Sequence, residues 1–229
     1  MPIRAICFDL DNTLWDVWPV IHRAERAMYE FLASRYPKVT AALTVEMMRE
    51  ARMRTAAEHP QMQHDFSFLR MQTLRDHASE FGYAEHMAEE AFEVFSRARN
   101  QVELYDDVLP ALERLHGTYR LFTATNGNAD LGQIGLAHYF ERRIAARQVG
   151  ALKPDAIIFQ KVVEGSGLAL GEVAFVGDDP VLDVVGSTAA GMLGIWLNRD
   201  GSPWPEHLEP PGAVVSSLDE IGALLGRAA

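Results

Sequence analysis

Residues 3–14 read IRAICFDLDNTL, a short apolar run that ends in two aspartates. An apolar run of this length is typical of a strand that is covered on both faces, as in a parallel sheet flanked by helices. Asp9 and Asp11 follow the run directly, and residues two apart on an extended chain point to the same side. The stretch therefore predicts a buried strand with two carboxylates converging at its end.

Similar short apolar runs recur in the second half of the chain, and each ends in polar or glycine-rich residues. They cover residues 121–124, 173–176, 194–197 and 213–215. Stretches with apolar residues at helical spacing lie between them, at residues 107–117, at residues 155–165 and from Pro180 to about Gly191. Strands that alternate with helices predict an α/β fold, with a doubly wound parallel sheet of the Rossmann-like type.

The region from about Asp16 to Gln101 breaks this alternation, because it contains no convincing strand. Its apolar residues recur every three or four positions, which predicts amphipathic helices. Four such stretches occur, one that starts at Val17 and others at roughly residues 44–57, 65–81 and 86–98. We therefore expect a catalytic core of residues 1–15 and 102–229, with residues 16–101 inserted as a four-helix bundle that forms a second domain.

Polar residues follow two more of the predicted strands, and a lysine precedes one of the predicted helices. The triplet TNG at residues 125–127 offers a hydroxyl, an amide and a permissive backbone, and GDD at residues 177–179 is followed by Asp183. Lys153, one of only three lysines, precedes Pro154 at the start of a predicted helix. Because the carboxyl ends of parallel strands meet at one edge of a sheet, these groups are expected to share a site.

As many as five carboxylates would converge at this edge, and their mutual repulsion requires a compensating cation. Two unit charges about 4 Å apart interact by about 4 kcal/mol at an effective dielectric constant near 20. A hard divalent ion relieves this repulsion, and Mg²⁺ suits a site of a few carboxylates plus a substrate phosphate. The lack of a Cys/His cluster argues against zinc.

Taken together, these motifs resemble the four ordered motifs of the haloacid dehalogenase-like superfamily. Residues 9–14 (DLDNTL), the pair at 125–126, Lys153-Pro154 and residues 177–179 with Asp183 occur in the order that the family shows. The resemblance covers roughly residues 1–15 and 102–226, and it places the helical insert where the family carries its cap domain. It implies a magnesium-dependent phosphatase, a phosphoric monoester hydrolase that forms an aspartyl-phosphate intermediate.

The resemblance also implies a role for each matching residue. Asp9 would be the nucleophile that attacks phosphorus, and Asp11 would protonate the leaving alkoxide and then activate a water molecule. Thr125, the Asn126 backbone and Lys153 would bind the phosphoryl oxygens while negative charge redistributes. Lys153 would in addition offset the charge of the nucleophile.

The metal site implied by the resemblance uses the same carboxyl ends. Asp178 would bind Mg²⁺ directly, together with Asp9 and the backbone carbonyl of Asp11. Asp179 and Asp183 would either bind the ion through water or orient the lysine.

Other residues bear on the choice among the family's chemistries. Asp11 argues for phosphoryl transfer, because the dehalogenases of the family need no acid for a leaving alkoxide and lack this aspartate. A phosphonate hydrolase would need a lysine in the helical insert, where only Lys38 occurs, in an expected loop beside Pro37. A phosphomutase shares all of these residues and stays open, as does a protein that binds a phosphorylated ligand without turnover.

Composition bears on partners and location. The chain of 229 residues has a formal net charge of −11, which disfavours nucleic acid as a partner and leaves a small phosphorylated metabolite. The single cysteine, Cys7, lies in the first apolar run and is expected to be a small buried hydrophobe. No apolar run approaches the length of a membrane span and the amino terminus lacks a signal-peptide pattern, so we expect a cytoplasmic protein and no membrane partner.

Overall fold

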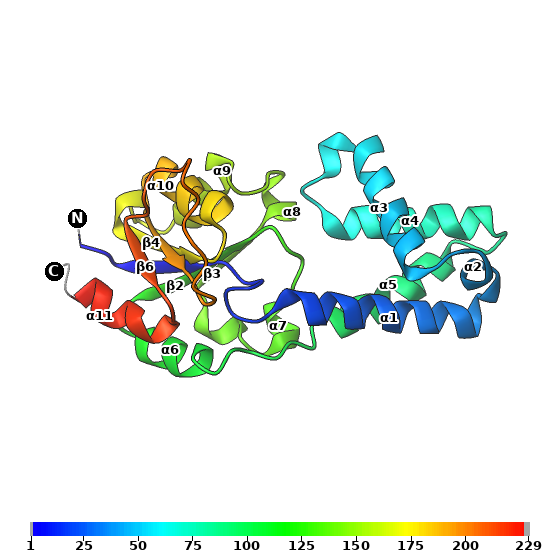
Figure 1. Cartoon of the computed structure of the whole chain (residues 1–229), viewed down its shortest axis with the longest axis horizontal. Helices are drawn as coiled ribbons and strands as arrows, with labels where there is room; N and C mark the ends of the chain where they lie inside the picture. Colours follow the sequence, from blue (N-terminus) through cyan, green and yellow to red (C-terminus); the bar gives the residue numbers. More distant parts are fainter. Residues whose placement is uncertain (1, 227–229) are drawn as a thin grey trace. The chain divides into compact units, whose positions relative to one another are not determined.

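The computed structural model describes residues 2–226. Its contacts divide the chain into two compact units. The first, which we call the sheet unit, comprises residues up to Asp16, residues 103–127 and residues from 135 onward. The second, the helical unit, comprises residues 17–102 and the short segment 128–134, whose membership of this unit the sequence did not predict. Figure 1 shows the elements of both units.

The sheet unit is built on six parallel strands in the order β3-β2-β1-β4-β5-β6. The strands are β1 (Ala5–Phe8), β2 (Arg120–Thr125), β3 (Arg142–Ala145), β4 (Val173–Gly177), β5 (Leu193–Leu197) and β6 (Ala213–Val215). The predicted α/β fold with a parallel, Rossmann-like sheet is therefore confirmed. All five predicted strands form, and β1 lies in the middle of the sheet.

The central strands are apolar because both of their faces are covered. Cys7 of β1 pairs in register with Phe122 on one side and Phe175 on the other, and all three side chains are fully buried. The cysteine is therefore the buried residue that the sequence predicted. Strand β3 was not predicted, because it lies at the edge of the sheet and begins with Arg142 and Arg143, which are not buried.

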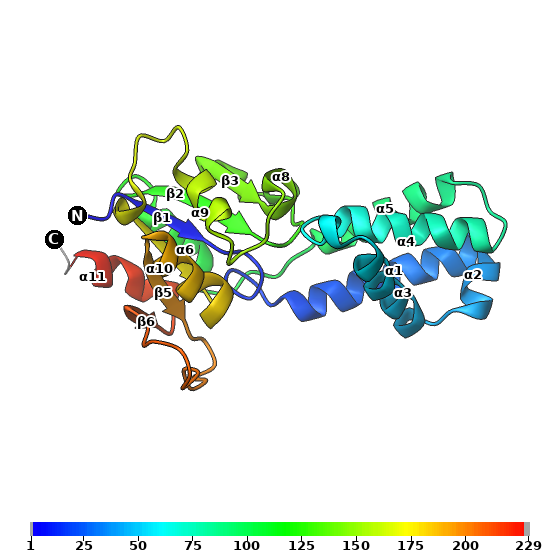
Figure 2. The ribbon, with the colours of Figure 1, turned by 90° about the horizontal axis from the view of Figure 1, so that it is seen from above.

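Helices cover both faces of the sheet, as Figures 1 and 2 show. One face carries α8 (Ala146–Val149), α9 (Ala156–Val163) and α10 (Gly186–Ala190), and the other carries α6 (Val108–Leu115) and α11 (Ile221–Gly226). A π-helix, η4 (Pro180–Val185), leads directly into α10, and Gly191 ends α10 with a φ of 99°, which glycine adopts without steric cost. The short 3₁₀ helices of this unit are η2 (Ala137–Tyr139), η3 (Leu170–Glu172) and η5 (Leu218–Glu220).

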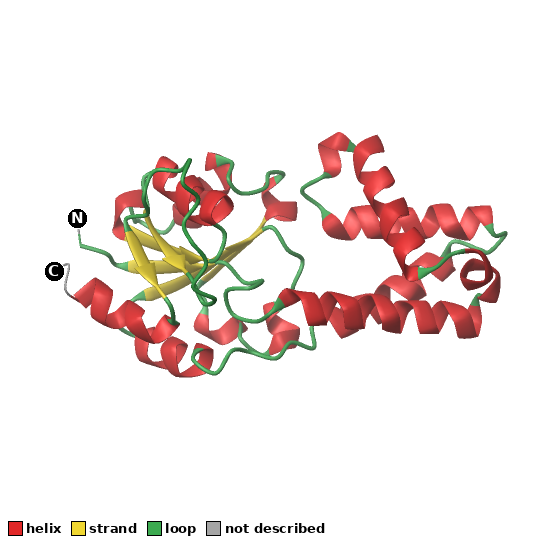
Figure 3. Ribbon diagram, viewed as in Figure 1, coloured by secondary structure: helices red, strands yellow, loops and turns green. Residues whose placement is uncertain are grey.

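The helical unit contains no strand within the described residues, as Figure 3 shows by colour. Its helices are α1 (Val17–Arg35), α2 (Pro37–Ala42), α3 (Val45–Glu58), η1 (Pro60–Met62), α4 (Phe66–Glu80), α5 (His86–Arg99) and α7 (Leu131–Ile134). The four predicted helices are confirmed as α1, α3, α4 and α5. Helix α2 was missed, and the expected loop at Lys38 is wrong, because Pro37 occupies the first turn of a helix, where its fixed φ is favourable.

Apolar side chains and a buried ionic cluster hold the helical unit together. Its core includes Leu32 of α1, Leu74 of α4 and Phe95 of α5, each at most 1% exposed. Glu25 of α1 is also buried and forms ion pairs with arginines of α3 and α4. No helix in the described part of the chain is long and apolar enough to cross a membrane.

Candidate active site

Asp9 directly follows β1 at the carboxyl end of the sheet. Its amide donates to the carbonyl of Val176 at 2.9 Å, which continues the sheet pairing by one residue, and the residue is only 6% exposed. The chain then turns sharply, with the amides of Thr13 and Leu14 donating to the carbonyl of Leu10. Asn12 takes a φ of 60° in this turn, a region that asparagine enters more readily than most residues.

The turn fixes Asp11, the second aspartate of the motif. Its Oδ1 accepts a hydrogen bond from the indole Nε1 of Trp15 at 2.8 Å, and Trp15 is completely buried. A rigid aromatic ring therefore limits the positions that the Asp11 carboxylate can take.

Lys153 lies at the centre of the site. Its Nζ donates to Asp9 Oδ1 and to Asp183 Oδ1, each at 2.6 Å, and its side chain is 3% exposed. Burial alone would lower the pKa of Lys153, but the two carboxylates raise it above its usual value. The lysine is therefore a fixed positive charge between two aspartates from different segments.

Thr125, the last residue of β2, and Asn126, which follows it, support this arrangement. The Asn126 side chain accepts from the Lys153 amide at 2.7 Å and donates to the Lys153 carbonyl at 3.1 Å. The hydroxyl oxygen of Thr125 accepts from the amide of Gly127 at 2.9 Å, so its own hydrogen can be directed elsewhere. Asn126 thus positions the backbone of the lysine, which the sequence did not predict.

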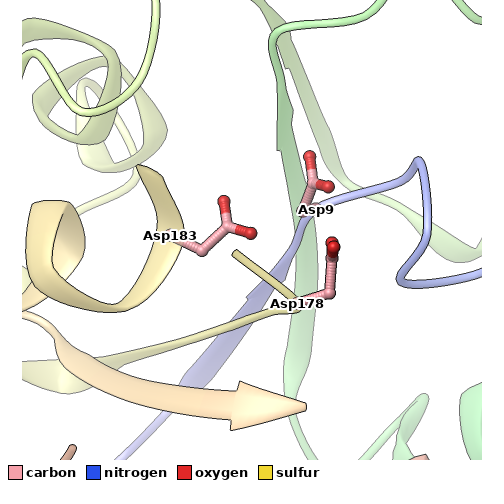
Figure 4. Close-up of side chains that lie close together, drawn as sticks. All are labelled: Asp9, Asp178 and Asp183. Carbon is pink, nitrogen blue, oxygen red and sulfur yellow. The ribbon is translucent and has the colours of Figure 1, made fainter. Parts of the chain in front are cut away.

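Asp178 and Asp183 bring two further carboxylates to Asp9. Carboxylate oxygens of the three residues all lie within 4.8 Å of one another, and Figure 4 shows their side chains gathered at the end of the strands. Glycine at position 177 allows Asp183 to approach so closely, because a Cβ at this position would lie 2.2 Å from Asp183 Oδ2. The Asp183 carboxylate therefore packs directly against the backbone of β4.

The electrostatics of the site favour a cation. Burial raises the pKa of Asp9 well above its usual value, against the opposing effect of Lys153. Burial and the neighbouring charge of Asp183 raise the pKa of Asp178 to about 7. Three carboxylates face one ammonium group, so the fully ionised cluster carries excess negative charge.

This cluster fits a divalent metal ion. Its candidate ligand atoms are hard carboxylate oxygens on Asp9, Asp178 and Asp183, the donor type that Mg²⁺ prefers. A doubly charged cation would neutralise the excess negative charge and lower the raised pKa values of the aspartates.

Asp179 has a different position from the other acidic residues. Its Oδ1 accepts from the amides of Val181 and Leu182, both at 2.8 Å, and so caps η4. Its amide donates to Asp183 Oδ2 at 3.0 Å. The structure therefore brings Asp179 next to the three carboxylates through its backbone, with one side-chain oxygen already occupied.

Sequence reasoning missed two residues that hold Asp178. The hydroxyl of Thr13 donates to Asp178 Oδ1 at 3.2 Å, and the indole Nε1 of Trp196 donates to the Asp178 carbonyl at 2.9 Å. Thr13 stands in the first motif, and Trp196 lies near the carboxyl end of β5, so their position along the strands was the available signal.

Comparison with known proteins identifies the family. The family model described as haloacid dehalogenase-like hydrolase matches residues 3–191. The chain therefore belongs to the haloacid dehalogenase-like hydrolases, as the ordered motifs and the parallel sheet predicted.

Among curated relatives, the chain is similar to phosphatases along almost its whole length. It is 29% identical to 5-amino-6-(5-phospho-D-ribitylamino)uracil phosphatase YigB of Escherichia coli over 216 residues, 91% of this chain and 90% of the relative. It is 27% identical to N-acylneuraminate-9-phosphatase of Rattus norvegicus in an alignment of 237 positions that covers 97% of this chain and 94% of the relative.

A solved structure points to a second chemistry in the same family. The crystal structure of 2-haloacid dehalogenase from Pseudomonas syringae pv. Tomato DC3000 has 37% identity and a TM-score of 0.93, covering 99% of this chain and 100% of that one. The fold and the family are therefore common to both groups of relatives.

Proposed function

We propose that this chain is a magnesium-dependent phosphatase that hydrolyses the phosphate ester of a small metabolite through an aspartyl-phosphate on Asp9. The observation that carries the proposal is the buried contact of Lys153 with Asp9 and Asp183, beside Asp178, at the carboxyl end of the sheet. An anionic nucleophile, a fixed cation and metal-binding carboxylates are the parts that phosphoryl transfer requires.

The first step is attack on phosphorus by Asp9. Its Oδ1 is bound to Lys153, so we assign Oδ2 as the attacking atom. A bond forms between Oδ2 and phosphorus, the ester P–O bond breaks, and the leaving alkoxide takes a proton from Asp11. The hydroxyl of Thr125, the backbone amide of Asn126 and the ammonium group of Lys153 stabilise the phosphoryl oxygens.

The second step is hydrolysis of the aspartyl-phosphate. Asp11, now ionised, takes a proton from water while the water oxygen attacks phosphorus. The bond from phosphorus to Asp9 breaks, which restores the carboxylate and releases inorganic phosphate. The indole of Trp15 holds Asp11 in one place for both proton transfers.

Mg²⁺ would be held by Asp9 and Asp178 with the backbone carbonyl of Asp11, and by Asp183 or Asp179 directly or through water. When bound, it supplies positive charge that offsets the phosphate and the clustered carboxylates. Because Lys153 already pairs with Asp183, we assign Asp183 the additional task of orienting the lysine.

The relatives suggest which esters to test first. The two phosphatases named above act, by their names, on 5-amino-6-(5-phospho-D-ribitylamino)uracil and on the 9-phosphate of an N-acylneuraminate. We propose that this chain acts on a phosphate monoester of this small-metabolite class.

The test is phosphate release from these two esters and from p-nitrophenyl phosphate, with Mg²⁺ and with excess chelator. We expect release that requires the metal ion. If the Mg²⁺-loaded protein released phosphate from none of these esters, the proposal would be overturned and a binding protein would be favoured. Transfer of phosphate to a second alcohol without hydrolysis would identify a phosphomutase.

Dehalogenation is a second candidate, favoured by the similarity to the 2-haloacid dehalogenase structure. Asp11 argues against it, because displacement of a halide from carbon needs no acid for the leaving group. Halide release from a 2-chloro acid, with no phosphate release from the esters, would establish this alternative.

A further inference from the structure

Arg199, just after β5, joins two segments that are far apart in the sequence. Its Nη1 donates to Asp107 Oδ2 at 3.0 Å, and its Nη2 donates to the carbonyl of Thr13 at 2.9 Å. The guanidinium lies 4.2 Å from the centre of the Tyr105 ring. The planar guanidinium group of Arg199 therefore binds two partners at once, and the face of the Tyr105 ring holds it in place.

Asp107 is a firm anchor for this arginine. Its Oδ2 also accepts from the hydroxyl of Ser217 at 2.9 Å and from the amide of Leu218 at 2.8 Å. Burial would raise the pKa of Asp107, but the hydrogen bonds from Arg199, Leu218 and Ser217 hold it below its usual value. The anchor is a carboxylate that three separate donors keep in place.

Thr13 connects the arginine to the site. The residue is completely buried and lies two positions after Asp11, within the turn that Trp15 closes. Arg199 holds its carbonyl, while its hydroxyl donates to Asp178 Oδ1 at 3.2 Å. Moving Thr13 would therefore displace both the turn that carries Asp11 and a hydrogen bond to Asp178.

We propose that Arg199 is a positioning residue for phosphoryl transfer, which acts by fixing the Thr13 carbonyl and hence the turn that holds Asp11. This inference rests on the proposed function. Its contribution is to keep the proton donor where the leaving oxygen departs.

The turn has enough other contacts to fold without the arginine. The amide of Tyr105 donates to the Leu14 carbonyl at 3.1 Å, and Asp107 keeps the donors of Ser217 and Leu218. An Arg199→Gln variant is therefore expected to fold, with a looser turn.

The effect should depend on the leaving group. An alkyl phosphate needs a proton on its leaving oxygen, whereas p-nitrophenolate leaves without one. We expect Arg199→Gln to lower the first-turnover rate of alcohol release from an alkyl phosphate by roughly 10- to 100-fold, a part of the roughly 100- to 10,000-fold that a positioned general acid contributes. We expect a much smaller change for p-nitrophenyl phosphate and little change in KM.

Two variants complete the design. Arg199→Lys keeps a positive charge beside Asp107, but one ammonium group reproduces the two-armed contact poorly, so its rate should fall between wild type and Arg199→Gln. Arg114→Gln removes an arginine that pairs with Asp219 on an exposed surface, and it should match wild type.

The measurements are first-turnover rates on both esters and the thermal midpoint of each variant. Equal losses on the two esters, or rates for Arg199→Gln equal to those of Arg114→Gln, would overturn the inference. Failure of the proposed function is seen separately, as absence of phosphate release by wild-type protein.

Discussion

Lys153 Nζ lies 2.6 Å from Asp9 Oδ1 and 2.6 Å from Asp183 Oδ1, so one buried ammonium group pairs with two carboxylates. Asp9 follows β1, Asp183 lies in η4 and Lys153 precedes α9. Three segments of the sheet unit are thus joined by a single side chain, and the site and the stability of the unit depend on the same contact.

Replacement of this lysine should therefore cost stability as well as activity. Lys153→Met leaves buried carboxylates without their cation, and removal of one partner of a buried ion pair typically costs about 3–5 kcal/mol of unfolding free energy. Urea unfolding measures the loss. Lys161→Met is the control, because Lys161 pairs with Glu164 at the surface and should contribute less than about 1 kcal/mol. Similar losses in both variants would contradict the assigned role.

Asp9→Asn should abolish phosphate release while keeping the fold, because the amide is a poor nucleophile of almost equal size. We expect a loss of several orders of magnitude in kcat, as for other covalent nucleophiles. Stability should change little, because Lys153 keeps Asp183 as its partner and the raised pKa of Asp9 means that burial already disfavours the charged form of this carboxylate. A beryllofluoride phosphate mimic should bind to wild type and not to the variant, and near-normal kcat in the variant would refute the assignment.

Gly177→Ala tests the close approach of Asp183 to the end of β4. The added Cβ would lie 2.2 Å from Oδ2 and 2.4 Å from Cγ of Asp183, so this carboxylate must shift from the position in which it pairs with Lys153. We expect kcat to fall by roughly 10- to 100-fold, as on loss of a supporting contact, with a higher Mg²⁺ concentration needed for half activation.

The control for that substitution is Gly222→Ala in α11, where the nearest atom to an added Cβ is a Leu115 methyl group at 3.9 Å. Alanine is favourable inside a helix, so this variant should keep full activity and equal or greater stability. Normal Mg²⁺ activation in Gly177→Ala would mean that Asp183 tolerates displacement.

The positions of Asp9, Asp178 and Lys153 could be anticipated because each follows or precedes a strongly patterned element. Period and apolar content define buried central strands well, and the ends of those strands define the edge where the site lies. The edge strand β3 could not be anticipated in this way, because Arg142 and Arg143 occupy its first two positions and interrupt any apolar run. Helix α2 was missed because Pro37 indicated a loop, although proline is favourable in the first turn of a helix.

The contacts that hold the site were less predictable than its charged groups. The bond from Trp196 to the Asp178 carbonyl and that from Arg199 to the Thr13 carbonyl join residues 18 and 186 positions apart. The sequence around Trp196 and Arg199 does not indicate which residues they bind, because the pairing depends on how the strand ends meet in space.

Mg²⁺ should stabilise the protein more at neutral to alkaline pH than at acid pH. Burial and the charge of Asp183 raise the pKa of Asp178 from 3.8 to about 7. Between these values the folded, metal-free protein keeps a proton that the unfolded chain has lost, so its unfolding free energy falls as pH rises through this window. Above about pH 7 the carboxylate is ionised and free to bind the metal ion.

Thermal unfolding with and without saturating Mg²⁺, at about pH 5 and about pH 8, measures this effect. The shift in midpoint should be larger at the higher pH in wild type. Asp178→Asn cannot titrate at this position and should show a small shift at both pH values. An equal shift in wild type at the two pH values would rule out proton competition at Asp178.

The buried ionic cluster of the helical unit allows a test that is independent of the site. Glu25 is 3% exposed, and its carboxylate accepts from Arg49 and from Arg70, whose pKa is lowered to about 9, chiefly by burial. Glu25→Gln leaves these guanidinium groups without their anion and should cost about 3–5 kcal/mol of unfolding free energy.

Hydrogen exchange in Glu25→Gln should quicken in α1, α3 and α4, while β1 and β4 keep their protection, because the two units have separate cores. Glu30→Gln, on the exposed side of α1, is the control and should change neither stability nor exchange. Faster exchange in the sheet strands of Glu25→Gln would show that the two units unfold together.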